Sequence, residues 1–168
     1  GVQREPGYGS MLGVELKLRT CTASQTVTAG QNKGSEGRLI GYRVLLCEDN
    51  ALNTEVADWI LQQAGIEVEN AADGQEAIQV FARSKPYHYD AVLMDIRMPH
   101  MDGLEAARRI RSMSRPDAGK VPIIAMTADA FEEDRQRSLQ AGMNAHITKP
   151  LSPEILYRTL LRFMDSED

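Results

Sequence analysis

Hydrophobic residues gather in five short runs along the part of the chain that follows Arg38. Each run is about four to six residues long, which is typical of strands rather than helices. The runs cover residues 43–47, 66–71, 91–94, 121–126 and 145–148. Polar residues do not alternate with apolar ones in the first, third and fourth runs, which indicates central strands buried on both faces.

The stretches after these runs have the spacing of amphipathic helices. In the first stretch Val56, Ile60 and Ala64 recur at intervals of four residues, and Gly65 then ends the helix. The last stretch opens with Ser152-Pro153, an N-cap residue followed by proline at the first helical position. One such stretch follows each apolar run, so we expect five helices.

This alternation of strands and helices over short links determines the expected fold class. Units of strand and helix build a parallel sheet with helices on both faces. The sequence therefore predicts a doubly wound α/β domain with a five-stranded parallel sheet and five helices. In sheets of this kind ligands bind beyond the carboxyl ends of the strands, so functional residues are expected there.

Polar side chains stand at the carboxyl ends of four of the predicted strands. Glu48 and Asp49 follow the first strand, Asp95 ends the third, and Thr127 and Lys149 come at the ends of the fourth and fifth. Two carboxylates about 4 Å apart repel by about 4 kcal/mol at an effective dielectric constant near 20. A lysine or a divalent cation relieves this repulsion, and a small set of oxygen ligands suits Mg²⁺. The set predicts a phosphoryl-transfer site with Asp95 as the nucleophile.

Each of these residues also has an ordinary explanation when it is taken alone. The segment Glu48-Asp49-Asn50 could simply cap the first helix, and Asp95 could accept hydrogen bonds from loop amides. Thr127 could be structural, and Lys149 before Pro150 could be a surface residue. Their joint placement at the ends of four strands favours the functional explanation.

Composition and charge exclude several classes of protein. The chain has 168 residues, of which 42% are hydrophobic and 26% charged, with a formal net charge of −5. This acidic balance argues against a nucleic-acid-binding surface, and no apolar run approaches the roughly 20 residues that span a bilayer. Cys21 and Cys47 lack the spacing of a metal site, and Cys47 reads as a small core residue. We therefore expect no disulfide, a reducing compartment and no membrane contact by this chain.

The composition changes near residue 40. Residues 21–38 are rich in Thr, Ser, Gly and Gln, which predicts a flexible linker. Residues 39–168 hold the regular pattern and form the predicted α/β domain. Before the linker, residues 13–20 alternate apolar and charged positions as a strand does, without a visible partner. Because the chain begins at Gly1, we expect it to be part of a longer protein.

Four motifs follow one another along the chain: "VLLCEDN", "VLMDIRMPHMDG", "PIIAMTA" and "AGMNAHITKP". In their order and spacing they resemble the receiver domain of two-component response regulators, over residues 39 to about 163. "LNTEV" and "MPHMDG" are similar to receivers at the C-terminal side of hybrid sensor histidine kinases. The resemblance implies a flavodoxin-like sheet with strand order 2-1-3-4-5.

The resemblance also implies a role for each polar residue at the strand ends. Asp95 is expected to be the phospho-acceptor, with Thr127 donating a hydrogen bond to the phosphoryl group and moving toward it on activation. Lys149 is expected to pair with phosphoryl oxygens, and its bond to Pro150 to be cis.

A Mg²⁺ site belongs to the same expectation. The resemblance implies that Asp49 and Asp95 are its carboxylate ligands, that Glu48 assists through water, and that the main-chain carbonyl of Arg97 is a further ligand.

Three further positions are expected to tune the site. His146 falls where the family often has a switch Tyr or Phe, and a plain strand residue is the alternative. Arg97 and Asp129 each lie two residues beyond a site residue and carry opposite charges. We expect them to approach across the mouth of the site and hinder the attacking water, the alternative being two unrelated surface charges.

The implied partner is the phosphohistidine of a histidine kinase or of a histidine phosphotransfer domain. Docking is expected around Leu52, Asn53, Val56 and Pro150. Residues 1–20 are similar to the last strand of a histidine-kinase ATP-binding domain, so they are expected to be a remnant without a nucleotide site. The chain is expected to be a monomer in the cytoplasm, or the cytoplasmic portion of a membrane-bound sensor kinase. A receiver of this kind catalyses its own phosphorylation and dephosphorylation, while the kinase core is absent.

Three rival functions remain to be weighed. A degenerate receiver that acts as a phosphate-independent interaction module would have lost the acidic pair, Thr127 or Lys149, and none is lost. A phosphatase of the haloacid dehalogenase type needs a second aspartate two residues after the first, where Arg97 stands. A nucleotide-binding protein needs a glycine-rich loop after the first strand, where Glu48-Asp49-Asn50 stands.

Overall fold

A computed structural model describes residues 37–165 of the chain as one α/β unit. The strands are β1 (Arg43–Cys47), β2 (Glu67–Ala71), β3 (Ala91–Asp95), β4 (Ile123–Thr127) and β5 (Ala145–Thr148). The helices are α2 (Ala51–Gln63), α3 (Gly74–Arg83), α4 (Gly103–Arg111), α5 (Glu132–Gln140) and α6 (Pro153–Met164). The predicted remnant at 1–20 and nearly all of the predicted linker at 21–38 lie outside the described residues.

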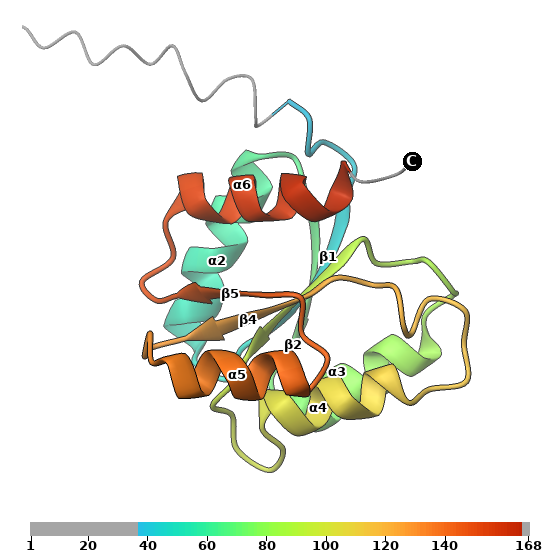
Figure 1. The fold of residues 1–168 in the computed structure, drawn as a ribbon. Helices are drawn as coiled ribbons and strands as arrows, with labels where there is room; N and C mark the ends of the chain where they lie inside the picture. The colour runs from blue at the N-terminus through green and yellow to red at the C-terminus, as the bar shows by residue number, and fades with distance from the viewer. Residues whose placement is uncertain (1–36, 166–168) are drawn as a thin grey trace, which may run out of the picture.

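All five strands are parallel, in the order β2-β1-β3-β4-β5. This confirms the predicted fold class and strand order. Figure 1 shows α2 and α6 on one side of the sheet and α3, α4 and α5 on the other. The central strands β1, β3 and β4 carry apolar side chains toward both helical layers, as expected of strands that are buried on both faces.

The hydrophobic core consists of two layers that share the sheet. One joins α2 and α6 to the sheet around Leu46, Leu93 and Ile124. The other joins α3 and α4 to its opposite face around Leu45 and Met94. Because each central strand sends alternate side chains to opposite layers, both layers hold the same strands in place.

The helix boundaries follow from local chemistry at their ends. Asn50 caps α2 by accepting a hydrogen bond from the backbone N–H of Asn53, and Asp102 caps α4 in the same way. Gly65 ends α2 with a φ of +76°, a conformation that glycine adopts without a steric penalty. Ser152 occupies the predicted N-cap position of α6, but its side chain makes no capping hydrogen bond, so Pro153 is the stronger start signal there.

Strand β4 begins two residues later than the apolar run predicts. The backbone N–H of Val121 donates to the carbonyl of Asp117, so Val121 belongs to the preceding turn. Pro122 has no N–H for the sheet and leads into the strand at Ile123. Cys47 is confirmed as a core residue, and burial raises the pKa of its thiol far above the usual range.

The loop between α4 and β4 is held by a side-chain clamp. The Arg115 guanidinium donates two hydrogen bonds to the carboxylate of Asp117, at 2.6 and 2.9 Å, and others to backbone carbonyls at the end of α3, including that of Phe81. Asp117 is almost fully buried and also accepts from the backbone N–H of Tyr87. Its pKa is lowered, because these hydrogen bonds outweigh the opposing effect of burial.

We predict that Arg115→Met destabilises the fold by about 3–5 kcal/mol, because it leaves the buried carboxylate of Asp117 without its partner. Urea unfolding of the two proteins measures the difference. Arg109→Met is the matched control, since its ion pair with Glu105 is exposed and such a pair is worth about 1 kcal/mol or less. Equal losses in the two variants would contradict the clamp.

Candidate functional site

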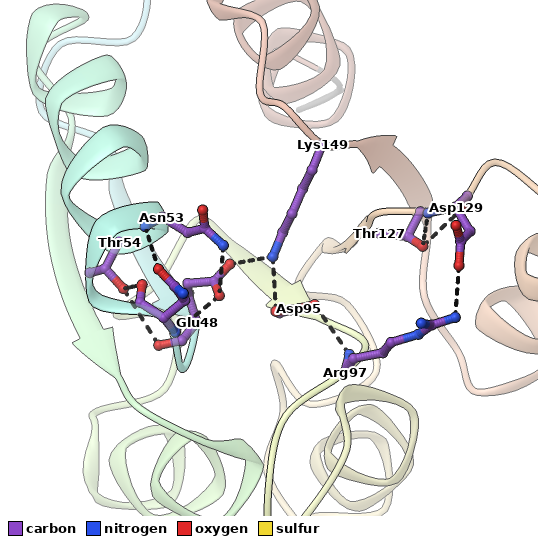
Figure 2. Close-up of polar contacts among 9 residues, drawn as sticks. Glu48, Asn53, Thr54, Asp95, Arg97, Thr127, Asp129 and Lys149 are labelled. Carbon is purple, nitrogen blue, oxygen red and sulfur yellow. Dashed lines mark hydrogen bonds and ion pairs between the residues drawn. The ribbon is translucent and has the colours of Figure 1, made fainter.

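The carboxyl edge of the sheet brings together residues from four strands. Glu48 and Asp49 follow β1, Asp95 ends β3, Thr127 ends β4 and Lys149 follows β5. Because the strands are parallel and adjacent, residues far apart in sequence meet at this edge. Figure 2 shows the side chain of Lys149 reaching down between Glu48 and Asp95.

Lys149 is the central charge of the site. Its Nζ lies 2.5 Å from Oε2 of Glu48 and 2.9 Å from Oδ2 of Asp95. Both carboxylates are nearly buried, with 4% and 5% of their residue surface exposed. One ammonium group thus neutralises part of the charge that two buried carboxylates bring to the same edge.

Burial and pairing shift the pKa values of the three groups in different directions. Burial raises the pKa of Asp95, and the hydrogen bond from Lys149 only partly opposes this. Burial also acts to raise the pKa of Glu48, but hydrogen bonds from Lys149 and from the backbone N–H of Asn50 prevail and lower it. Burial acts to lower the pKa of Lys149, and its two carboxylate partners raise it above the ordinary value. The pKa shifts of Glu48 and Lys149 therefore favour their charged forms, while the shift of Asp95 favours its neutral form.

Three carboxylates are close enough to share a cation. One oxygen from each of Glu48, Asp49 and Asp95 lies within 4.8 Å of the others. Asp49 is exposed, unlike the other two, so the cluster opens to solvent on its side. A set of hard oxygen ligands that leaves room for water fits Mg²⁺ better than a soft metal. A cation here would also favour the ionised form of Asp95.

The loop after β3 holds Asp95 by its backbone. The N–H of Arg97 donates to Oδ1 of Asp95 at 3.1 Å, and the N–H of Gly103 donates to the carbonyl of Ile96 at 2.9 Å. A Cβ on Gly103 would lie 2.1 Å from the carbonyl oxygen of Asp95. Only glycine therefore lets the start of α4 pack against the end of β3.

Thr127 and Asp129 form a small closed turn at the end of β4. The hydroxyl of Thr127 donates to the carbonyl of Asp129 at 3.0 Å and accepts from its N–H at 3.1 Å. The hydroxyl is therefore engaged within its own loop, as Figure 2 shows. A hydrogen bond from Thr127 to a phosphoryl group stays a prediction.

The side chains of Arg97 and Asp129 meet across the mouth of the site. Nη2 of Arg97 lies 2.7 Å from Oδ2 of Asp129, and both side chains reach solvent. The predicted approach of the two residues is thus observed in the structure, while its effect on an attacking water stays a prediction.

Comparison with known proteins identifies the family. The response regulator receiver domain matches residues 44–161. The chain belongs to this family. Hybrid signal transduction histidine kinase I of Dictyostelium discoideum is 34% identical over 140 residues, and probable histidine kinase 2 of Oryza sativa subsp. indica is 40% identical over 124 residues. These alignments cover 82% and 67% of this chain but only 8% and 12% of the two relatives.

Solved receiver structures have the same fold. The receiver domain of a sensor histidine kinase from Pseudomonas aeruginosa, described with a magnesium ion coordinated in its active site cleft, is 42% identical with a TM-score of 0.68. The alignment covers 75% of this chain and 99% of that one. A second structure holds the receiver of a Saccharomyces cerevisiae response regulator in complex with a histidine phosphotransfer protein. That receiver is 27% identical with a TM-score of 0.65, and the alignment covers 74% of this chain and 89% of that one.

A narrow apolar cavity adjoins the site of this receiver domain. Its volume is about 200 Å³, and it is lined by Glu48 and Lys149 together with Leu52, Val56 and Leu151. The side chain of Leu52 is exposed, which agrees with the prediction of a docking surface here and does not test it. Within the described range, no helix of the receiver domain is long and apolar enough to cross a membrane.

The sequence does not predict the contact between Asn53 and Glu48, although Asn53 is one of the residues expected at the docking surface. Nδ2 of Asn53 lies 3.5 Å from Oε1 of Glu48, and the capping residue Asn50 is the sequence signal for the helix start at that place. His146 lies half-buried on β5, beside a cavity that three arginines line. A switch role and a plain strand residue both stay predictions for His146.

We predict that Gly103→Ala destabilises the receiver domain by about 1–3 kcal/mol, because the added Cβ overlaps the backbone of Asp95. Gly119→Ala is the matched control, since a Cβ at Gly119 meets nothing within 4 Å and does not require a strained backbone. Thermal unfolding of both variants measures the difference. A stability of Gly103→Ala equal to that of the control would show that α4 does not pack as described.

Proposed function

We propose that Asp95 is the phospho-acceptor of a receiver domain in a hybrid histidine kinase, and that it takes its phosphoryl group from a phosphohistidine. A carboxylate oxygen of Asp95 attacks the phosphorus, and the P–O bond forms as the P–N bond breaks. The imidazole leaves as a neutral ring, which keeps the proton that its other nitrogen carried in the phosphohistidine. The donor belongs to a histidine kinase or to a phosphotransfer domain. The observation that carries the proposal is the position of Asp95, buried at the end of β3 with Lys149 on one oxygen.

The remaining residues supply charge and position. Lys149 stands where it can pair with a phosphoryl oxygen on Asp95, and Thr127 ends the neighbouring strand, within reach after its turn opens. Mg²⁺ would be held by Asp49 and Asp95, with Glu48 assisting and the carbonyl of Arg97 as a further ligand, and it would neutralise charge on the transferred phosphoryl group. The magnesium ion coordinated in the active site cleft of the Pseudomonas receiver supports this choice of metal.

The partner that fits this surface is a phosphohistidine domain with an apolar contact surface. Leu52 and Val56 lie one turn apart on α2 and line the apolar cavity beside Lys149. A partner surface packed there would bring its histidine close to the site. The yeast receiver in complex with a phosphotransfer protein supports this class of partner.

We predict that acetyl phosphate with Mg²⁺ adds one phosphoryl group to the wild-type chain and none to Asp95→Asn. Intact-mass spectrometry measures the adduct, and removal of Mg²⁺ with EDTA should abolish it, because the cluster of carboxylates then repels the donor. Asp134→Asn on α5 is the matched control and should be modified like wild type.

Two results would point to rival functions. An unmodified wild-type chain, with Mg²⁺ present, would favour a degenerate receiver that binds partners without phosphate. Continuous hydrolysis of phosphate esters over many turnovers would favour a phosphatase.

We predict that Arg97→Ala shortens the lifetime of the phosphorylated protein by about 1.5- to 5-fold, because it removes the ion pair that covers the mouth of the site. Loss of the adduct over time, followed by mass spectrometry, measures the rate. Asp129→Ala should have a similar effect, and the double variant should add little to either single one. High salt should reduce the difference, since the pair is exposed. Equal lifetimes in wild type and Arg97→Ala would contradict the hypothesis.

A further inference from the structure

The carboxylate of Glu48 is held by donors from two separate parts of the chain. Its Oε2 accepts from the ammonium of Lys149 at 2.5 Å. Its Oε1 accepts from the backbone N–H of Asn50 at 3.2 Å and from the side-chain amide of Asn53, whose Nδ2 lies at 3.5 Å. Figure 2 shows Asn53 and Lys149 reaching Glu48 from α2 and from the end of β5. One oxygen thus has a charged donor, while the other has two neutral donors.

The first turn of α2 is built around Glu48. Oδ1 of Asn50 accepts from the backbone N–H of Asn53 at 3.1 Å, which fixes the backbone from which the Asn53 side chain extends. The hydroxyl of Thr54 donates to the carbonyl of Asn50 at 3.1 Å and, over a longer 3.5 Å, to the carbonyl of Glu48. Because this turn is already ordered, only the side-chain torsions of Asn53 remain to be fixed for its amide to reach Glu48.

The neutral charge of the Asn53 amide suits a place beside a cation site. A second ammonium group here would hold Glu48 equally well, but it would repel a divalent cation bound between the carboxylates. An amide donates a hydrogen bond and leaves the negative charge of Glu48 available to the metal. Lys149 alone would draw Glu48 toward β5, and Asn53 opposes this from α2. Groups that orient the surroundings of a metal in this way commonly affect its affinity.

Asn53 also borders the apolar cavity beside the site. It lines this cavity together with Glu48 and Lys149, next to Leu52 and Val56. Asn53 is exposed in the chain alone, so water competes for its amide. A partner surface on Leu52 and Val56 would cover the amide and exclude this water, which would strengthen the hydrogen bond to Glu48.

We propose that Asn53 is a positioning residue of the magnesium site, whose neutral amide holds Glu48 on the side of α2 so that its carboxylate can assist the cation bound by Asp49 and Asp95. The inference rests on the Mg²⁺ site of the proposed function. It gives Asn53 a role at the metal in addition to its place on the expected docking surface.

Magnesium affinity tests this role directly. The whole chain is titrated with MgCl₂, and the backbone amide shifts of residues 48–50 and 95–97 are followed by NMR. We expect Asn53→Ala to bind Mg²⁺ about 2- to 10-fold more weakly than wild type, since it removes a long hydrogen bond to a charged group. Gln62→Ala, at an exposed position in the last turn of the same helix, is the matched control and should bind like wild type. The same spectra show that each variant stays folded.

A double variant separates positioning of Glu48 from a general effect on α2. In the Glu48→Gln background there is no carboxylate to position, so adding Asn53→Ala should change the affinity for Mg²⁺ by less than about 2-fold. An equal loss in both backgrounds would contradict the proposal, and so would an unchanged affinity in Asn53→Ala alone. A wild-type chain whose shifts do not respond to Mg²⁺ would overturn the magnesium site itself and this inference with it.

Discussion

The pairing of one ammonium group with two buried carboxylates is the interaction on which the carboxyl edge of this sheet depends. Glu48 and Asp95 come from adjacent strands, and β-sheet geometry forces their side chains to the same edge. Two buried negative charges at such a distance would repel strongly in a medium of low polarity. Lys149 follows the edge strand β5, which is adjacent to neither β1 nor β3. Its ammonium group bridges the two carboxylates. The positions of three strand ends are thereby linked by charge as well as by backbone.

The same arrangement leaves the site incompletely neutralised. Asp49 adds a third carboxylate, while Lys149 brings one positive charge to its pairs with Glu48 and Asp95. Burial raises the pKa of Asp95, so its surroundings disfavour the ionised form of this carboxylate. A divalent cation favours that ionised form, and an ionised carboxylate is the nucleophile that phosphoryl transfer requires. A cation held by these carboxylates would therefore favour the form of Asp95 that the proposed mechanism requires.

The sequence predicted the sheet well because the periodicity of buried residues is a local signal. The apolar runs around Leu45, Leu93 and Ile124 gave the central strands, and the polar residues after them gave the site. Opposite charges two residues beyond Asp95 and Thr127 were enough to anticipate the approach of Arg97 and Asp129. Contacts made by long side chains with distant backbone carbonyls left no such local signal. Arg115 donates to a backbone carbonyl at the end of α3. Arg111 donates to the carbonyls of Ala118, Val121 and Gly142. Nothing in the sequence around either arginine indicates these acceptors.

The orientation of Thr127 could not be predicted for a different physical reason. A hydroxyl group rotates freely and takes the best acceptor within reach, which here is the carbonyl of Asp129 in its own turn. The turn thus competes with any group on Asp95 for the hydroxyl of Thr127. The salt bridge from Arg97 to Asp129 restrains the side chain of the residue whose carbonyl is that acceptor. Loss of the salt bridge would therefore have two effects. It would free the turn, which favours contact of Thr127 with the phosphoryl group. It would also open the mouth of the site to water, which favours hydrolysis of the phosphorylated aspartate.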